Sequence, residues 1–146
     1  MAMTGKRKTQ LWMAVMGIAF ACVAARAQDV VIVANRSVVA SQISEAQLRE
    51  IFTGVRSRLN DGTRTVPVLL KGGAVHEVFL HHYVRDNPEE FRTRWHKAVF
   101  TGQGSMPKEF GSEAELLNYV EATPGAIGYV SRVNEKNSVK VLRVLQ

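Results

Sequence analysis

The sequence is poor in cysteine, with Cys22 alone among 146 residues. One cysteine forms no disulfide within the chain and cannot supply the cysteine pairs of a structural zinc site. Glycine and proline are modest as well, at 11 and 4 residues, which excludes a collagen-like chain and a low-complexity disordered one. Hydrophobic residues make up 46% of the chain. This composition predicts an ordinary globular protein.

Long hydrophobic runs are also lacking. The longest, residues 11–25, falls short of the roughly 20 apolar residues that span a bilayer. Basic residues 6–8 precede this run, and Ala25 and Ala27 provide the small side chains of a signal-peptidase site. We therefore expect residues 1–27 to be a secretory signal peptide that is cleaved near Ala27.

Cleavage would leave residues 28–146, which we expect to form a single periplasmic or secreted domain. Two alternatives remain for the leader. A membrane anchor is disfavoured because the apolar run is short. Lipidation of Cys22 is disfavoured because Phe20 stands where a lipidation motif usually has a small or β-branched residue.

Excess positive charge is scarce outside the leader. The full chain has a net charge of +6, and Lys6, Arg7, Lys8 and Arg26 contribute four of these charges, so removing the leader leaves +2. The remaining basic residues are interleaved with acidic ones and form no stripe. We therefore expect no nucleic-acid partner.

The first half of residues 28–146 alternates strand and helix signals. The β-branched run at residues 30–33 predicts a strand buried on both faces, as in a parallel or mixed sheet. Ser44 and Gln47 form a capping box for a helix that begins at Glu45 and is closed by Gly54.

A second strand and two further helices follow. Residues 65–70 predict a strand, in which Pro67 indicates an edge position or a strand start. Helical spacing resumes at Ala74. Asn87 then caps a helix with Pro88 in its first turn.

The last third of the chain predicts a loop, a helix and two strands. Residues 101–107 lack periodicity and are expected to be a loop. Ser112 and Glu115 predict another capping box, followed by strands at residues 126–130 and 139–144. The alternation of strands and helices predicts an α/β fold.

Catalytic and metal-binding patterns are lacking. Three of the four histidines, His76, His81 and His82, fall on one expected helix, but their spacing does not match a metal-binding helix. We interpret them as a solvated helix face. No serine stands in a nucleophile elbow. We expect no enzyme activity, catalytic residue, metal or cofactor.

Two glycine-containing segments are candidate ligand sites. Gly72 and Gly73 lie between a strand and a helix, where free N–H groups and the helix dipole favour an oxyanion, and Lys71 adds positive charge. The second segment is the loop containing Thr101, Gly102, Gly104 and Ser105. The alternative is that both segments are ordinary connections.

Five segments together resemble a known family. They are residues 31–35 (VIVAN), 44–54 (SEAQLREIFTG), 60–62 (NDG), 91–104 (FRTRWHKAVFTGQG) and 124–130 (PGAIGYV). This set resembles the phosphate-binding proteins of ABC transporters and their short, single-lobe relatives. The resemblance implies an α/β fold that is one lobe of a type II periplasmic-binding-protein-like structure, with a mixed sheet flanked by helices. The glycine- and serine-rich phosphate loop of the family's first lobe has no counterpart here.

The resemblance also implies a weakened phosphate site. The family usually has Gly-Ser-Gly-Thr before the second-lobe helix, whereas this chain has Gly72, Gly73, Ala74 and Val75, so both hydroxyls are lost. The position of the family's arginine falls on Leu69. Each missing charge-assisted hydrogen bond removes roughly 1.5–3 kcal/mol.

These observations favour a secreted, non-enzymatic solute-binding-protein-like domain. Its expected ligand is phosphate or another small oxyanion, and a membrane transporter or an envelope protein is its expected partner. A homodimer would supply a second wall for the site. The alternative is an accessory or interaction module of the cell envelope that has lost ligand binding.

Overall fold

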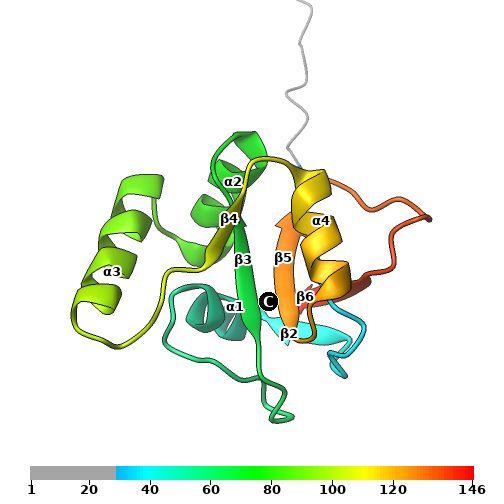
Figure 1. Ribbon diagram of the computed structural model, residues 1–146, viewed down its shortest axis with the longest axis horizontal. Helices are drawn as coiled ribbons and strands as arrows, with labels where there is room; N and C mark the ends of the chain where they lie inside the picture. The colour runs from blue at the N-terminus through cyan, green and yellow to red at the C-terminus, as the bar shows by residue number, and fades with distance from the viewer. Residues whose placement is uncertain (1–28) are drawn as a thin grey trace, which may run out of the picture.

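A computed structural model describes residues 29–146, drawn in colour in Figure 1. The expected signal peptide, its cleavage near Ala27 and the lipidation alternative at Cys22 lie outside these described residues. Within residues 29–146, no helix combines the length and the apolar character that crossing a membrane requires.

A six-stranded mixed sheet forms the centre of the fold (Figure 1). Its order is β2-β6-β1-β5-β3-β4. The central strand β1 is antiparallel to both β5 and β6, whereas β3 is parallel to both of its neighbours, β5 and β4. The strands are β1 (Val31–Ala34), β2 (Gln42–Ser44), β3 (Val66–Leu70), β4 (Lys108–Phe110), β5 (Ala126–Val130) and β6 (Lys140–Leu145).

Helices cover both faces of this sheet. Helix α4 packs against β5, β3 and β1 on one face, and α1 lies behind the sheet in Figure 1. Helix α3 stands to one side. The helices are α1 (Glu45–Phe52), α2 (Ala74–Phe79), the π-helical segment η1 (Leu80–Val84), α3 (Pro88–Phe100) and α4 (Glu113–Ala122).

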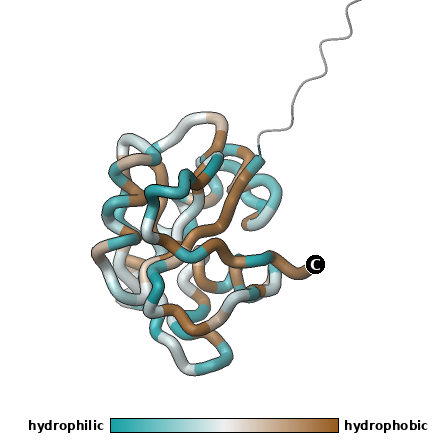
Figure 2. The backbone as a smooth tube through the Cα atoms, turned by 90° about the vertical axis from the view of Figure 1, so that its right-hand side faces the viewer, coloured by the Kyte–Doolittle hydropathy of each residue, from teal (hydrophilic) through white to brown (hydrophobic). Residues whose placement is uncertain are grey.

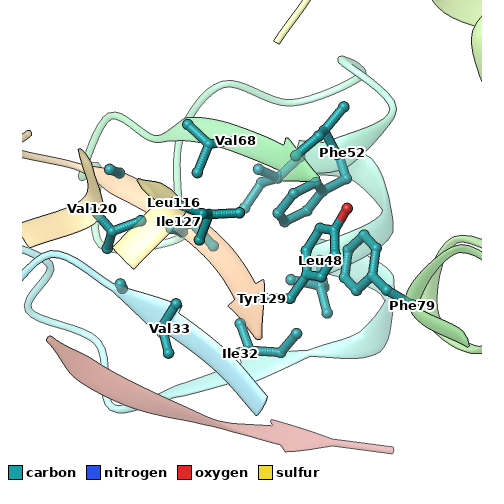
Figure 3. Packing of buried hydrophobic residues seen from close by; sticks show 14 of the residues in the cluster. Ile32, Val33, Leu48, Phe52, Val68, Phe79, Leu116, Val120, Ile127 and Tyr129 are labelled. Carbon is teal, nitrogen blue, oxygen red and sulfur yellow. The ribbon is translucent and has the colours of Figure 1, made fainter. Parts of the chain in front are cut away.

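The hydrophobic core has two layers, one on each face of the sheet (Figure 3). Ile32 and Tyr129 are paired across β1 and β5, and Tyr129 packs with Phe52 and Phe79 on the face that carries α1 and α2. The opposite face meets α4. The strands are accordingly rich in hydrophobic residues, which appear brown in Figure 2.

Gly128 lets α4 approach the sheet closely. A Cβ atom at this position would lie 2.8 Å from Leu116 Cδ2 on α4 and 3.0 Å from Val68 Cγ2 on β3. Any larger side chain would therefore push α4 away from the sheet. Gly128, in the segment at residues 124–130, thus serves packing.

Trp95 joins α3 to the end of α1. Its indole N–H donates a 3.0 Å hydrogen bond to the carbonyl oxygen of Phe52. A Cβ atom at Gly54 would lie 2.8 Å from Trp95 Cη2, so glycine makes room for the ring. Two segments that carry the family resemblance, residues 44–54 and 91–104, therefore meet at this contact.

The structure confirms the predicted helix starts. Ser44 and Gln47 form the capping box of α1, and Asn87 accepts hydrogen bonds from the N–H groups of Glu89 and Glu90 at the start of α3. The box predicted at Ser112 is only half formed. Ser112 accepts from the Glu115 N–H, but the Glu115 carboxylate accepts from the N–H of Gly111 instead of returning to Ser112.

Two sheet features differ from the prediction. The short strands β2 and β4 carry no strong strand signal, and their positions depend on pairing with β6 and β3. The edge interpretation of Pro67 is wrong, because β3 lies between β5 and β4. The strand-start alternative is right: pairing with β4 begins only at Val68, beyond the proline.

Candidate functional site

Three parallel strands end at the same edge of the sheet. Residues 71–73 follow β3, Gly111 and Ser112 follow β4, and Ser131 follows β5; the arrows of β3 and β5 point the same way in Figure 1. We call these segments the carboxyl edge. Ligands of open α/β sheets usually bind outside the carboxyl ends of the strands. The carboxyl edge is therefore the first place to look for a site.

Gly73 forms the start of α2 without a side-chain cap. Its backbone φ is 93° and its ψ is 170°, a conformation that glycine adopts readily and other residues rarely do. The carbonyl of Gly73 accepts the first hydrogen bond of the helix, from the N–H of Glu77. The N–H groups of Ala74, Val75 and His76, which precede Glu77, have no intrahelical acceptor.

A pocket of about 270 Å³ opens between the N-termini of α2 and α4. We call it the N-terminal pocket. Helix N-termini carry partial positive charge, so two that border one pocket favour an anion there. Its lining is made of Leu70, Gly72, Gly73, Ala74, Val75, Gly111, Ser112 and Glu113.

Glu113 opposes this positive potential in part. Glu113 lines the pocket, and its carboxylate accepts hydrogen bonds from the backbone N–H and the hydroxyl of Ser131, at 2.8 and 2.9 Å. These two donors satisfy one carboxylate oxygen. The negative charge nevertheless remains beside the pocket and weakens its attraction for an anion.

The sequence-predicted residues at the glycine junction divide between two pockets. Gly72, Gly73 and Ala74 are exposed in the N-terminal pocket, while the side chain of Val75 is buried at 7% exposure. Lys71 instead lines a second pocket on the other side of Gly72. Gly111, Ser112, Glu113 and Ser131 were not predicted as site residues. The parallel pairing of β3, β4 and β5, which brings them together, has no local sequence signal.

The structure does not bring the predicted loop of residues 101–105 to this edge. It follows the C-terminal end of α3, away from the start of α2 (Figure 1). The Thr101 hydroxyl donates to the carbonyl oxygen of Lys97, and the Gly102 N–H donates to that of Val99, so both residues close the helix. Gly104 and Ser105 are exposed in the same loop. A helix C-terminus carries partial negative charge, which disfavours an anion.

His76 is not on a solvated face, which corrects the interpretation from sequence. It is 7% exposed, and its Nδ1 lies 2.5 Å from the hydroxyl oxygen of Tyr129. The other two histidines of this stretch, His81 and His82, are exposed as expected. Among residues 29–146, no group of three or more histidine, cysteine, aspartate or glutamate side chains is placed to hold a metal ion.

Burial determines the protonation of this buried pair. It lowers the pKa of His76 below its ordinary value; nearby Glu77 opposes the shift, and Arg92 adds to it. Burial also raises the pKa of Tyr129. Both shifts favour the neutral forms, so Tyr129 keeps its hydroxyl proton and His76 is an uncharged imidazole near neutral pH.

The mixed sheet, the helices on both faces and the pocket at the carboxyl edge define one lobe of a type II periplasmic-binding-protein-like fold. No protein-family profile matches the sequence. No curated protein matches it significantly either.

Several solved structures with a similar fold carry names that describe phosphate transport. An ABC-type phosphate transport receptor from Vibrio cholerae aligns with a TM-score of 0.52 at 15% identity, over 79% of this chain and 45% of the receptor. A phosphate ABC transporter substrate-binding protein from Clostridium perfringens, with bound phosphate, aligns with a TM-score of 0.58 at 17% identity, over 79% of this chain and 44% of that protein. PstS from Borrelia burgdorferi aligns with a TM-score of 0.57 at 16% identity, over 79% of this chain and 46% of PstS. This chain thus spans less than half the length of these structures.

Proposed function

We propose that this chain is a secreted, non-enzymatic solute-binding-protein-like domain that binds phosphate or another small oxyanion in the N-terminal pocket. The observation that carries this proposal is the convergence of two helix N-termini on one pocket, with the start of α2 free of a side-chain cap. The solved structures with the same fold support it, since their names describe phosphate transport and one holds phosphate. A periplasmic or secreted location and a membrane transporter as partner are parts of the same proposal.

The pocket supports weak binding. Backbone amides are its main donors, because Gly73 and Val75 carry no hydroxyl and Leu69 is a fully buried apolar side chain of β3. Glu113 adds a negative charge at the rim. We therefore expect a dissociation constant far weaker than hydroxyl- and arginine-lined sites would give.

Thermal unfolding with and without phosphate tests the proposal. A ligand that binds only the folded state stabilises it by about 2.7 kcal/mol at 100 times its dissociation constant. We expect phosphate to raise the melting temperature of the purified protein by several degrees. Sulfate and chloride at matched ionic strength are the controls. A shift that sulfate produces equally would indicate a site for small oxyanions without selectivity for phosphate, and no shift with either anion contradicts the proposal.

Two variants locate the site. Gly73→Asp places a carboxylate where the anion would lie and should abolish the phosphate-induced shift, whereas Glu113→Gln removes a repulsive charge and should enlarge it. Gly62→Asp is the matched control, because Gly62 also has a positive φ, and a Cβ atom at either glycine meets nothing within 4 Å. An unchanged shift in Gly73→Asp would place the anion elsewhere.

The accessory-module alternative is favoured by one surface feature. Phe100 at the end of α3 is 92% exposed, and it borders an apolar groove with Val99 and Met106. Exposed apolar side chains that cluster in this way are typical of protein contacts. A protein that shows no phosphate response would therefore be better described as a module that docks on an envelope protein.

A further inference from the structure

A second, smaller pocket lies on the other side of Gly72 from the N-terminal pocket. It has a volume of about 110 Å³ and is enclosed by the end of β3, strand β4, helix α2 and the first turns of α3. Since a single water occupies roughly 10–15 Å³ on this measure, the pocket has room for several waters or one small organic molecule. We call it the mixed-charge pocket for its four charged side chains, Lys71, Glu77, Arg92 and Glu109.

These four charges are available to a ligand. Lys71 and Arg92 are positive and Glu77 and Glu109 are negative, so the side chains balance one another in number. Among residues 29–146, none of the four makes a salt bridge within 4.0 Å or a side-chain hydrogen bond. Two cations and two carboxylates therefore line the same small space, and none of them is held in a direct ion pair.

His76 is a fifth polar residue that lines the pocket. The N–H of Leu70 donates a 3.1 Å hydrogen bond to the Tyr129 hydroxyl oxygen. We assign the Tyr129 hydroxyl as the donor to Nδ1 of His76, 2.5 Å away, because its oxygen already accepts from Leu70. Because Nδ1 accepts, the neutral ring carries its proton on Nε2.

The Nε2–H group has no partner among the described residues. His76 is more than nine-tenths buried, and it lines the mixed-charge pocket. Among the described residues, Thr65 Oγ1 is the buried side-chain atom that lacks a partner, so Nε2 of His76 is instead accessible to solvent in the pocket. A ligand with an acceptor oxygen can therefore accept a hydrogen bond from the Nε2–H group.

We propose that the mixed-charge pocket binds a small zwitterion, a free α-amino acid with a small side chain such as glycine or alanine. The carboxylate of the ligand accepts from the Nε2–H of His76 and faces Lys71 and Arg92. Its ammonium group faces Glu77 and Glu109. Apolar side chains from the start of α3 and the following loop, Phe91 and Met106, contact the remaining carbon atoms.

The ligand class follows from charge and size together. A simple anion would meet the two carboxylates, and a simple cation would meet the lysine and the arginine. Only a molecule with both charges a few bonds apart satisfies both sets of side chains. This inference does not rest on phosphate binding, since the two pockets share only Gly72.

Titration of the purified full chain with glycine and alanine, followed by calorimetry and by NMR chemical shifts, tests this inference. We expect saturable binding of at least one of them. Acetate and methylammonium each carry half of the charge pattern, and we expect both to bind at least tenfold more weakly. Equal binding of acetate, or no saturable binding of either amino acid, would overturn the proposal.

Two substitutions of His76 separate binding from folding. His76→Asn keeps an acceptor near the Nδ1 position for Tyr129 but removes the Nε2–H donor, so binding should fall at least tenfold while the melting temperature changes little. His76→Gln keeps an amide donor near Nε2 but leaves the Tyr129 hydroxyl without an acceptor, so it should retain more binding than His76→Asn at a lower melting temperature. The reverse ranking of affinities would refute the assigned role of Nε2.

Neutral substitutions of the charged side chains complete the test. Arg92→Gln and Glu109→Gln should each weaken amino-acid binding at least fivefold, and both side chains are exposed, so neither should unfold the protein. Arg132→Gln, at an exposed arginine outside the pocket, is the control. Amino-acid binding and phosphate-induced melting shifts should both be measured on Arg92→Gln, Glu109→Gln and Gly73→Asp. The two pockets are distinguished if Gly73→Asp removes the phosphate-induced shift and leaves amino-acid binding unchanged. Unchanged amino-acid affinity in both pocket variants would contradict the proposal.

Discussion

Tyr129 connects three separate parts of the chain. Its ring stacks on Phe79 of α2 with a centroid distance of 3.8 Å and an interplanar angle of 6° (Figure 3). Its hydroxyl bonds the backbone of Leu70 at the end of β3 and the side chain of His76. The end of β3, the start of α2 and strand β5 are thereby fixed relative to one another. A residue deep in the core thus determines the geometry of both pockets.

We predict that His76 makes stability depend on pH below neutrality. Burial lowers its folded-state pKa, so the unfolded chain takes up the proton first as the pH falls. At pH values above the ordinary histidine pKa of about 6.5, His76 is neutral in both the folded and the unfolded chain and does not change the free energy of unfolding. Below that pH this free energy should fall by up to about 1.4 kcal/mol per pH unit, until the pH passes the folded-state pKa. Urea unfolding at pH 7.5, 6.5 and 5.5 measures the slope.

His76→Asn removes the titrating group and should flatten that part of the profile. The matched control is His96→Asn, which makes the same change at an exposed histidine of α3. If His76→Asn and the unchanged protein lost stability equally between pH 6.5 and 5.5, the pH dependence would have to come from other groups.

The start of α3 depends on a local capping interaction. Asn87 accepts from the N–H groups of Glu89 and Glu90, and the Glu90 carboxylate accepts from the Asn87 N–H at 3.1 Å. Pro88 fills the first helical position. These interactions involve only neighbours in sequence, which is why the sequence predicted them correctly. The same holds for Ser44 and Gln47 at the start of α1.

Asn87→Ala should destabilise the protein by about 1 kcal/mol, because two N–H groups lose their acceptor. We expect the melting temperature to fall by a few degrees. Asn118→Ala, at an exposed position inside α4, is the control and should be neutral or slightly stabilising, since alanine favours helix more than asparagine does. Equal falls in melting temperature for Asn87→Ala and Asn118→Ala would mean that the Asn87 cap does not stabilise the protein.

Other elements could not be predicted from local sequence. The π-helical segment η1 ends where Arg85 adopts a left-handed conformation with φ 63°, and its N–H bonds the carbonyl of Leu80, five residues earlier. Strands β2 and β4 have three residues each. Such short strands exist because a neighbouring strand offers free backbone groups, and a single segment of sequence does not contain that information.

At the scale of the whole molecule, one copy leaves the N-terminal pocket open. Gly72, Gly73, Gly111 and Ser112 are all exposed, whereas small-molecule sites usually bury most of the ligand surface. The chain also covers less than half of the solved phosphate-transport structures that share its fold. Tight binding would therefore need a further surface that covers the open side of this pocket.

We predict that phosphate promotes a homodimer that closes this pocket. Sedimentation velocity should show monomers in chloride and a growing fraction of dimers as phosphate replaces chloride at constant ionic strength. Gly73→Asp should remain monomeric in both buffers, and Gly62→Asp should behave like the unchanged protein. Monomers that bind phosphate would instead show that a single copy is enough to hold the anion.

The segments that carry the family resemblance support the fold more directly than the site. Trp95 packs on Gly54, and Gly128 admits α4, so these residues determine packing. Their contacts explain how a chain can keep the fold while the hydroxyls expected at Gly73 and Val75 are lost. Likeness in fold therefore constrains the ligand less than the lining of the pocket does.

Local sequence patterns are enough to predict the α/β class, the helix starts and the strand-to-helix junction at Gly72 and Gly73, because caps, glycine turns and hydrophobic periodicity act between near neighbours. The set of residues that share a pocket depends instead on how the strands pair and pack. Parallel pairing placed Ser112 and Glu113 in one pocket with Gly73 and brought Ser131 into hydrogen-bonding distance of Glu113. Packing against Tyr129 buried His76, which local sequence indicates as a surface residue. Such contacts join residues far apart in the chain, and their energies depend on a packed core that no local pattern encodes.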